Sequence, residues 1–174
     1  MLRETHICCQ GKRTERSGRR DCMDYHYKKI AAANFEVTVG NPMGNAEKIL
    51  RMAAEEFEKG TDILVFPELA LTGYTCGDLF LQSYLQELVW EAVNRLIHGL
   101  PEQMITVVGL PVRADGRLFN AAAVFNNKSI AGIVPKSFIP NYGEFYEKRW
   151  FTPAAERLND ILILQERVQV TEKP

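Results

Sequence analysis

The sequence lacks several features that would assign it to a large class of proteins. No apolar run approaches the roughly 20 residues that a membrane-spanning helix needs, and the basic N-terminus has no apolar segment typical of a secretory signal. The 21 basic and 22 acidic residues leave a net charge of −1, so neither nucleic acid nor an anionic membrane is an expected partner. A Gly-rich phosphate loop of the form GxGxxG is also missing.

Cysteine is scarce, and three of the four cysteines precede residue 23. They provide no disulfide framework for the rest of the chain, so we expect a reducing, cytoplasmic setting. His6, Cys9, Cys22 and His26 could in principle surround a zinc ion. However, the ligand order is not that of a zinc finger, and the accompanying aromatic and leucine positions are absent. We therefore interpret residues 1–27 as a disordered extension without a metal site.

The chain after residue 28 alternates between helical and strand-like patterns of apolar residues. One helix is expected from an N-cap at Asn45 to a C-terminal glycine at Gly60, and a second at about Leu81 to His98. Apolar runs predict strands at 63–66, 104–112, 119–125, 128–135 and 161–164, whereas residues 28–35 fit a helix or a strand. Helices closely joined to strands are typical of layered α/β proteins.

The sequence also predicts one hairpin turn and the side-chain alternation of one strand. Asp115 and Gly116 lie between two apolar runs and predict a hairpin turn. In the strand at 128–135 the residues are expected to alternate between the two faces of the sheet, with Ile130, Gly132 and Val134 on one face and Ala131 and Ile133 on the other.

Two ionisable side chains stand directly after predicted strands. Glu68 follows the strand at 63–66 and Pro67, and Lys136 follows the strand at 128–135. If these strands are neighbours in the sheet, both side chains face one edge, which is a common ligand position. Glu68 could then act as a general base and Lys136 could stabilise a developing oxyanion. A solvated loop carboxylate and a strand-end lysine that reaches water are the structural alternative.

Two longer motifs contain these side chains, namely FPELALTGYTCGDLF at Phe66–Phe80 and VPKSFIPNYGEFYEKRWF at Val134–Phe151. Together they resemble the nitrilase, or carbon–nitrogen hydrolase, superfamily, and within it the N-terminal glutaminase domain of the glutamine-dependent NAD(+) synthetases. The resemblance implies an α/β fold, a nitrilase-like α-β-β-α sandwich of which this chain holds roughly the N-terminal half. The implied partial domain covers residues 28–164, and a divergent tail covers residues 165–174.

The resemblance also implies a Glu–Lys–Cys triad that hydrolyses glutamine without a cofactor. Glu68 matches the glutamate that deprotonates the cysteine, Lys136 matches the lysine that stabilises the tetrahedral intermediate, and Glu144 matches a second, supporting glutamate. Tyr142 matches a tyrosine that helps bind glutamine, and Tyr74 is expected to line the same pocket. Attack on the side-chain amide gives a thioester and ammonia, and water then releases glutamate.

The family's nucleophilic cysteine has no match in this sequence, because in the family it lies beyond the segment that matches Leu164. Cys76 belongs to the TGYTCGDLF motif and is interpreted as a packed thiol. The synthetase domain, which uses ATP and Mg²⁺ to form NAD(+) from nicotinate adenine dinucleotide, has no match either. We therefore expect a truncated form without glutaminase or NAD(+)-forming activity. The partners implied for the parent enzyme are glutamine, the synthetase domain and further copies in a homo-oligomer.

Two other functions remain open. One is a different amidase of the same superfamily that acts on a small amide or nitrile, although the TGYTCGDLF motif favours the synthetase group. The other is a non-catalytic fragment that binds partners through an exposed sheet. Half of a sandwich is expected to expose an apolar sheet face and unpaired strand edges, which favours aggregation.

Overall fold

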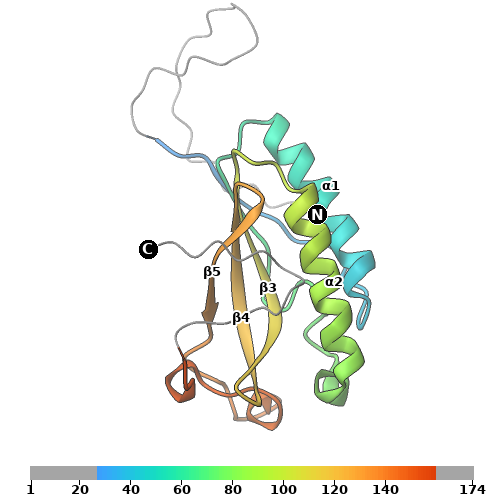
Figure 1. Cartoon of the computed structure of the whole chain (residues 1–174), viewed down its shortest axis with the longest axis vertical. Coiled ribbons are helices and arrows are strands. Elements are labelled where there is room, and N and C mark those ends of the chain that lie inside the picture. Colours follow the sequence, from blue (N-terminus) through green and yellow to red (C-terminus); the bar gives the residue numbers. More distant parts are fainter. Residues whose placement is uncertain (1–26, 160–174) are drawn as a thin grey trace, which may run out of the picture.

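A computed structural model describes residues 27–159, which form a five-stranded sheet with two helices on one face (Figure 1). The strands follow chain order across the sheet: β1 (Ile30–Ala32), β2 (Ile63–Val65), β3 (Ile105–Ala114), β4 (Arg117–Asn126) and β5 (Ser129–Pro135). The first three strands are parallel, and β4 and β5 continue as antiparallel strands. The candidate zinc ligands His6, Cys9, Cys22 and His26, and the strand predicted at 161–164, lie outside the described residues.

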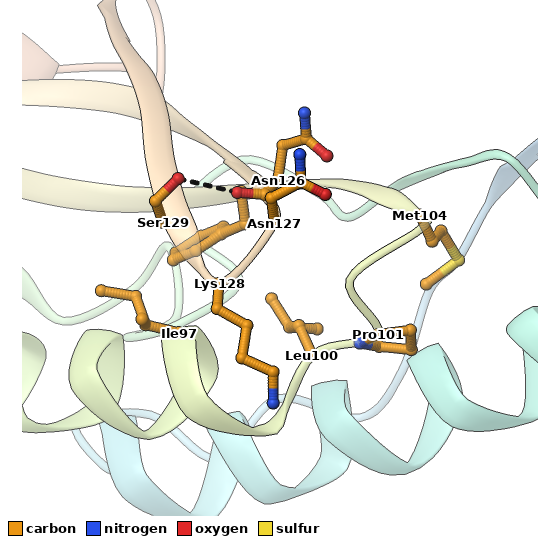
Figure 2. A pocket seen from close by; sticks show the side chains of 9 residues that line it. Ile97, Leu100, Pro101, Met104, Asn126, Asn127, Lys128 and Ser129 are labelled. Atoms are coloured by element: carbon orange, nitrogen blue, oxygen red, sulfur yellow. Dashed lines mark hydrogen bonds between the residues drawn. The ribbon is translucent and has the colours of Figure 1, made fainter. Parts of the chain in front are cut away.

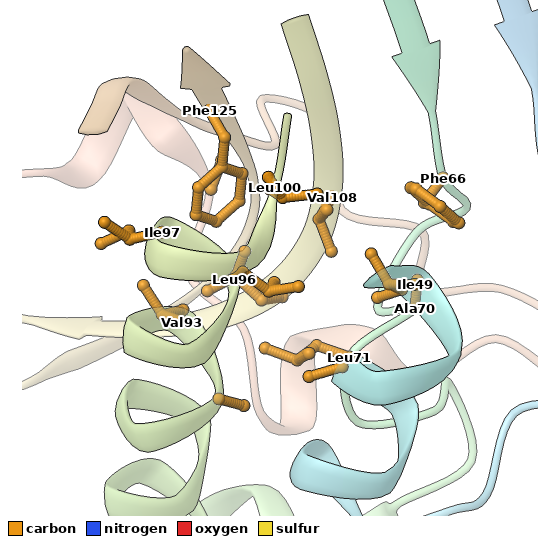
Figure 3. Packing of buried hydrophobic residues seen from close by; sticks show 14 of the residues in the cluster. Ile49, Phe66, Ala70, Leu71, Val93, Leu96, Ile97, Leu100, Val108 and Phe125 are labelled. Carbon is orange, nitrogen blue, oxygen red and sulfur yellow. The ribbon is translucent and has the colours of Figure 1, made fainter. Parts of the chain in front are cut away.

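The helices α1 (Pro42–Glu58) and α2 (Ser83–Gly99) connect the parallel strands and pack on the same side of the sheet (Figure 1). Their apolar sides meet alternate residues of the strands, and Figure 3 shows Ile49 of α1 and Leu96 of α2 beside Val108 of β3. All three side chains are fully buried. The alternating helices and strands confirm the predicted α/β class.

The start of α1 differs from the prediction. Asn41 is the N-cap, and its side chain accepts a hydrogen bond from the Gly44 amide at 3.0 Å, while Pro42 takes the first helical position. Asn45 instead lies inside the first turn and is fully buried. Its amide group donates to the carbonyls of Thr38 at 2.8 Å and Leu71 at 3.0 Å. Asn45 is therefore not the N-cap. Its buried side chain links α1 to the segment that follows β2.

The strand β5 does not alternate as predicted, because it contains a bulge. Phe125 pairs with Ile130, but the preceding Val124 pairs with Gly132, so Ala131 is the extra residue. The extra residue shifts the two-residue period by one position. Consequently Ile130 and Ile133 both pack against the helix-side core, whereas Val134 is 61 % exposed.

The sheet face that carries no helices is apolar and partly open. Ile30 of β1, Val65 of β2 and Val134 of β5 are among its exposed residues. One helical layer and one sheet are half of the α-β-β-α sandwich that the sequence predicts. None of the helices in residues 27–159 is long and apolar enough to cross a membrane.

Candidate active site

The candidate site begins at a tight turn after β2. The Ala70 amide donates to the Pro67 carbonyl at 3.2 Å, and the Gly73 amide donates to the Leu69 carbonyl at 2.7 Å. Leu69 has a φ of +50°, in the left-handed region that costs a non-glycine residue about 1–2 kcal/mol. Leu69 is fully buried, so packing holds this strained turn in place. The turn fixes the backbone on both sides of Glu68.

A glycine in β3 lets this turn lie close over one face of the sheet. A Cβ atom on Gly109 would lie 2.5 Å from the Leu69 nitrogen and 2.5 Å from the Pro67 oxygen. No side chain fits in that space, because both neighbours are backbone atoms. The chain therefore runs directly over β3 and brings Glu68 toward β4 and the end of β5.

Glu68 and Lys136 meet although their strands are not neighbours. The contact was expected only if β2 and β5 were neighbours, but β3 and β4 lie between them. The crossing over Gly109 covers that distance, and the Lys136 ammonium donates to Glu68 Oε1 at 2.7 Å. The Glu68 side chain is 42 % exposed and that of Lys136 is 28 % exposed, so the pair remains accessible to a small molecule.

A second carboxylate completes the surroundings of Lys136, and it belongs to Glu147. The ammonium donates to Glu147 Oε1 at 3.2 Å and Oε2 at 3.0 Å. Tyr74 donates its hydroxyl proton to Glu147 Oε1 at 2.6 Å. Glu147 is only 3 % exposed, so these contacts satisfy a charge that would be costly to bury alone. Residues from three distant parts of the chain thus form one hydrogen-bonded cluster.

The cluster shifts the pKa values of two of its members. Burial lowers the pKa of Lys136, but its hydrogen bonds to Glu68 and Glu147 outweigh burial, so the net pKa is raised. The pKa of Tyr74 is raised first by burial and then by its hydrogen bond to Glu147. Lys136 is therefore held as a cation and Tyr74 as a neutral donor.

An exposed ion pair fixes the segment that carries Glu147. Arg149 donates to both carboxylate oxygens of Asp78 at 2.8 Å, and the Trp150 indole nitrogen donates to Asp78 at 2.9 Å. Both residues lie in the short 3₁₀ turn region that starts at Glu147. Asp78 belongs to the loop that also carries Tyr74, so the contact joins the two motifs identified in the sequence.

The other residues expected in the site lie outside the cluster. Glu144 is exposed, and it forms no hydrogen bond or ion pair with another residue in the described range. Tyr142 is 72 % exposed and packs edge-on against Phe145 at a centroid distance of 5.9 Å. The carboxylate placed against Lys136 is that of Glu147, three residues after the expected one. Tyr74 belongs to the cluster because its hydroxyl group donates a hydrogen bond to Glu147.

Sequence reasoning missed Glu147 and Asn120. Glu147 lies three and four residues before Trp150 and Phe151, so one helical turn places it on their side of the segment, and Phe151 is buried. Asn120 interrupts an apolar run in β4 and is 3 % exposed; its side-chain amide donates to Glu68 Oε1. A polar residue inside an apolar, buried strand is the sequence feature that could have identified Asn120 as a site residue.

Cys76 is buried beside the cluster's loop. It is 5 % exposed, its thiol donates to the Thr72 carbonyl at 3.1 Å, and burial raises the pKa of the thiol. A thiol with a raised pKa is a poor nucleophile, because the thiolate is the reactive form.

A shallow hollow lies away from this cluster. It is found between the end of α2 and the β4–β5 turn, where Ser129 donates to the Asn126 carbonyl (Figure 2). This is the end of β5 opposite to Lys136. Hence the hollow has no part in the chemistry of the cluster.

Comparison with known proteins places these features in a family. The model of the carbon-nitrogen hydrolase family matches residues 29–171. The glutamine-dependent NAD(+) synthetase of Mycobacterium bovis is 38 % identical over 128 residues, which are 73 % of this chain and 19 % of that protein. The solved glutamine-dependent NAD+ synthetase of Acinetobacter baumannii is 31 % identical with a TM-score of 0.69, over 72 % of this chain and 24 % of the other.

A shorter relative shows how much of the fold is present. The carbon-nitrogen hydrolase of Helicobacter pylori is 26 % identical with a TM-score of 0.59, over 72 % of this chain and 44 % of the other. The chain spans about a fifth of the length of the curated synthetases that it matches. The matched region includes every member of the cluster around Lys136, and this chain belongs to the carbon–nitrogen hydrolase family.

Proposed function

We propose that this chain carries the general base and the cation of a glutaminase site, which hydrolyses the side-chain amide of glutamine and supplies ammonia for NAD(+) synthesis. The observation that supports the proposal most is the contact of Lys136 with Glu68 at 2.7 Å and with Glu147 at 3.0 Å. The similarity to glutamine-dependent NAD(+) synthetases supports glutamine as the substrate.

In the proposed reaction, Glu68 removes the proton from a cysteine thiol and the thiolate attacks the amide carbon. The Lys136 ammonium stabilises the negative charge that develops on the amide oxygen. Glu68 then passes its proton to the departing nitrogen, which leaves as ammonia, and water hydrolyses the thioester to glutamate. Glu147 keeps Lys136 charged and oriented, and Tyr74 orients Glu147.

The proposal includes the inactivity of this chain on its own. Cys76 is the cysteine within residues 27–159, and it is buried with its thiol bonded to Thr72. The remaining cysteines, Cys8, Cys9 and Cys22, precede the region that matches the family. We therefore propose that the nucleophile comes from sequence that corresponds to a further part of the longer relatives.

The proposed hydrolysis uses no cofactor, because a thiol, a base and a cation supply all of its steps. We assign ATP and Mg²⁺ to the synthetase part of the longer relatives; the described residues contain no group of three or more His, Cys, Asp or Glu side chains that could hold a metal. The proposed partners are glutamine, a synthetase domain and further copies of the subunit, and the proposed location is the cytoplasm.

A chimera tests the proposal. Residues 29–159 would replace the matching residues of the Mycobacterium bovis synthetase, and glutamate release would be measured with glutamine and with asparagine. We expect hydrolysis of glutamine, and a loss of about 10²-fold or more in Glu68→Gln, with Glu87→Gln on the exposed side of α2 as the matched control. A folded chimera that prefers other small amides would favour the amidase alternative, and full activity of Glu68→Gln would refute the assigned base.

A further inference from the structure

Asn120 lies at the centre of the candidate site and has no role in the reaction described above. It occupies the middle of β4, between the two strands whose ends carry Glu68 and Lys136. Its side chain points to the same face as Gly109, because Asn120 pairs with Pro111 and Ala122 pairs with Gly109 across the β3–β4 ladder. This is the face over which the Glu68 turn passes.

Asn120 contacts both partners of the charged pair. Its side-chain amide donates to Glu68 Oε1, and its backbone carbonyl accepts the Lys136 amide proton at 2.8 Å. The backbone bond fixes the position of Lys136 at the end of β5, and the side-chain bond fixes the carboxylate. One residue on an interior strand therefore contacts two residues that follow different strands of the sheet, β2 and β5.

The two donors on Glu68 leave one of its oxygens available. Asn120 and Lys136 both donate to Oε1, whereas Oε2 accepts no hydrogen bond from any residue in the described range. A carboxylate oxygen held by two donors is a weaker proton acceptor than a free one. The arrangement thus distinguishes the two oxygens of a single side chain.

We propose that Asn120 is a positioning residue that holds Glu68 by Oε1 and so presents Oε2 as the atom that takes the proton. This proposal rests on the proposed glutaminase function, in which Glu68 takes the proton of the thiol. The contact between Asn120 and Glu68 does not depend on the substrate, because it exists in the chain without glutamine.

The contact can be measured by NMR in the unmodified chain. The side-chain amide signals of Asn120 are expected to differ between wild type and Glu68→Gln, because the charged acceptor is lost. The exposed Asn127 serves as the control amide, and its signals are expected to be the same in both proteins. Asn120 signals that change no more than those of Asn127 would overturn the proposal, whether or not the site hydrolyses glutamine.

A double-mutant cycle tests whether Asn120 acts through Glu68. The Lys136 ammonium faces the carboxylates of Glu68 and Glu147, so its titration midpoint reports how well Glu68 is held. Asn120→Leu is expected to lower that midpoint in the wild-type background and to leave it unchanged in the Glu68→Gln background. An equal shift in both backgrounds, or none in a folded Asn120→Leu, would contradict the positioning role.

Two further variants separate positioning from folding. Thr106→Val replaces a fully buried polar side chain of β3 and is expected to leave the Lys136 midpoint unchanged. Asn120→Asp keeps the size of the side chain but places a second carboxylate against Glu68. Two adjacent carboxylates titrate far apart, so the Lys136 signal should gain an additional inflection that Asn120→Leu lacks. Absence of that inflection would contradict the contact even if Asn120→Leu failed to fold.

Discussion

At the scale of single residues, the function of Lys136 depends on which carboxylates surround it. Glu68 and Glu147 bind the ammonium, and Glu147 is in turn bound by Tyr74. Glu144, which the sequence resemblance favoured as the supporting carboxylate, lies exposed in the same loop. The two glutamates thus offer a matched pair of substitutions, one inside the cluster and one outside it.

Glu147→Gln is predicted to lower the pKa of Lys136, because it removes one of the two anions that raise it. Glu144→Gln is predicted to leave that pKa unchanged. The measurement is the pH titration of the Lys136 side-chain signals by NMR in the two variants. A shift in Glu144→Gln that equals the shift in Glu147→Gln would contradict the assignment of the supporting carboxylate.

The raised pKa of Lys136 also predicts the pH dependence of stability. A pKa above the unfolded value means that the folded state binds the proton more tightly. This contribution is fully present below the unfolded lysine pKa of about 10.4, and it is lost as the pH rises through the folded pKa. Urea unfolding between about pH 9 and pH 12, the range in which lysines titrate, should show a steeper loss of stability in wild type than in Lys136→Met. Parallel curves would refute the contribution.

At the scale of elements, the site depends on the crossing of the Glu68 turn over β3. The crossing is possible because Gly109 has no side chain where the backbone of Pro67 and Leu69 passes. Gly109→Ala is predicted to destabilise the chain by about 1–3 kcal/mol through overpacking, and to displace Glu68 from Lys136. Urea unfolding measures the first effect, and the Lys136 titration measures the second.

Gly132→Ala is the matched control for that substitution. Gly132 also lies in a strand of the sheet, but a Cβ atom there meets nothing within 4 Å. Its substitution is predicted to change the free energy of unfolding by about 0.5 kcal/mol or less. Equal effects of the two substitutions would show that strand glycines in general, and not the crossing, account for the loss.

The contact between Asp78 and Arg149 is predicted to fail in acid. Hydrogen bonds from Arg149 and then Trp150 hold the pKa of Asp78 well below its usual range. Such a lowered pKa contributes stability above the unfolded value of about 3.9, which is lost as the pH falls through the folded pKa. Asp78→Asn should therefore flatten the acid limb of the stability curve measured by urea unfolding. An unchanged acid limb would contradict this assignment.

Elements could be predicted from the sequence where one local signal decides them. The hairpin at Asp115 and Gly116 is confirmed, since their φ values of +52° and +74° fit the turn that Asp-Gly favours. The bulge at Ala131 was not predictable, because it depends on pairing with β4. Likewise, the contact of Glu147 with Lys136 was not predictable, because it joins two segments that only the folded chain brings together.

At the scale of the whole molecule, the described residues form one helical layer and one sheet, with an apolar face open on the other side. Val134 on the edge strand β5 is 61 % exposed and Val65 is 36 % exposed. Exposed apolar strands at an edge promote association between chains. The parts of the longer relatives that this chain does not match are the proposed source of both a covering layer and the nucleophile.

Val134→Lys is predicted to weaken concentration-dependent self-association of the purified chain, because a charged edge residue opposes strand pairing. Sedimentation velocity over a range of concentrations measures the effect. Gln103→Lys adds the same charge at an exposed position outside the sheet and should leave association unchanged. Identical behaviour of both variants would attribute any effect to net charge alone.

The most direct test of the account is the release of glutamate from glutamine by the purified 174-residue chain. We propose that Glu68, Lys136 and Glu147 supply the base and the cation, while the nucleophile comes from elsewhere. We therefore expect no glutamate above the background for a chain whose NMR spectrum shows the Lys136 cluster in place. Glutamate release that is abolished by Glu68→Gln would contradict the proposal, because the chain would then contain a complete site.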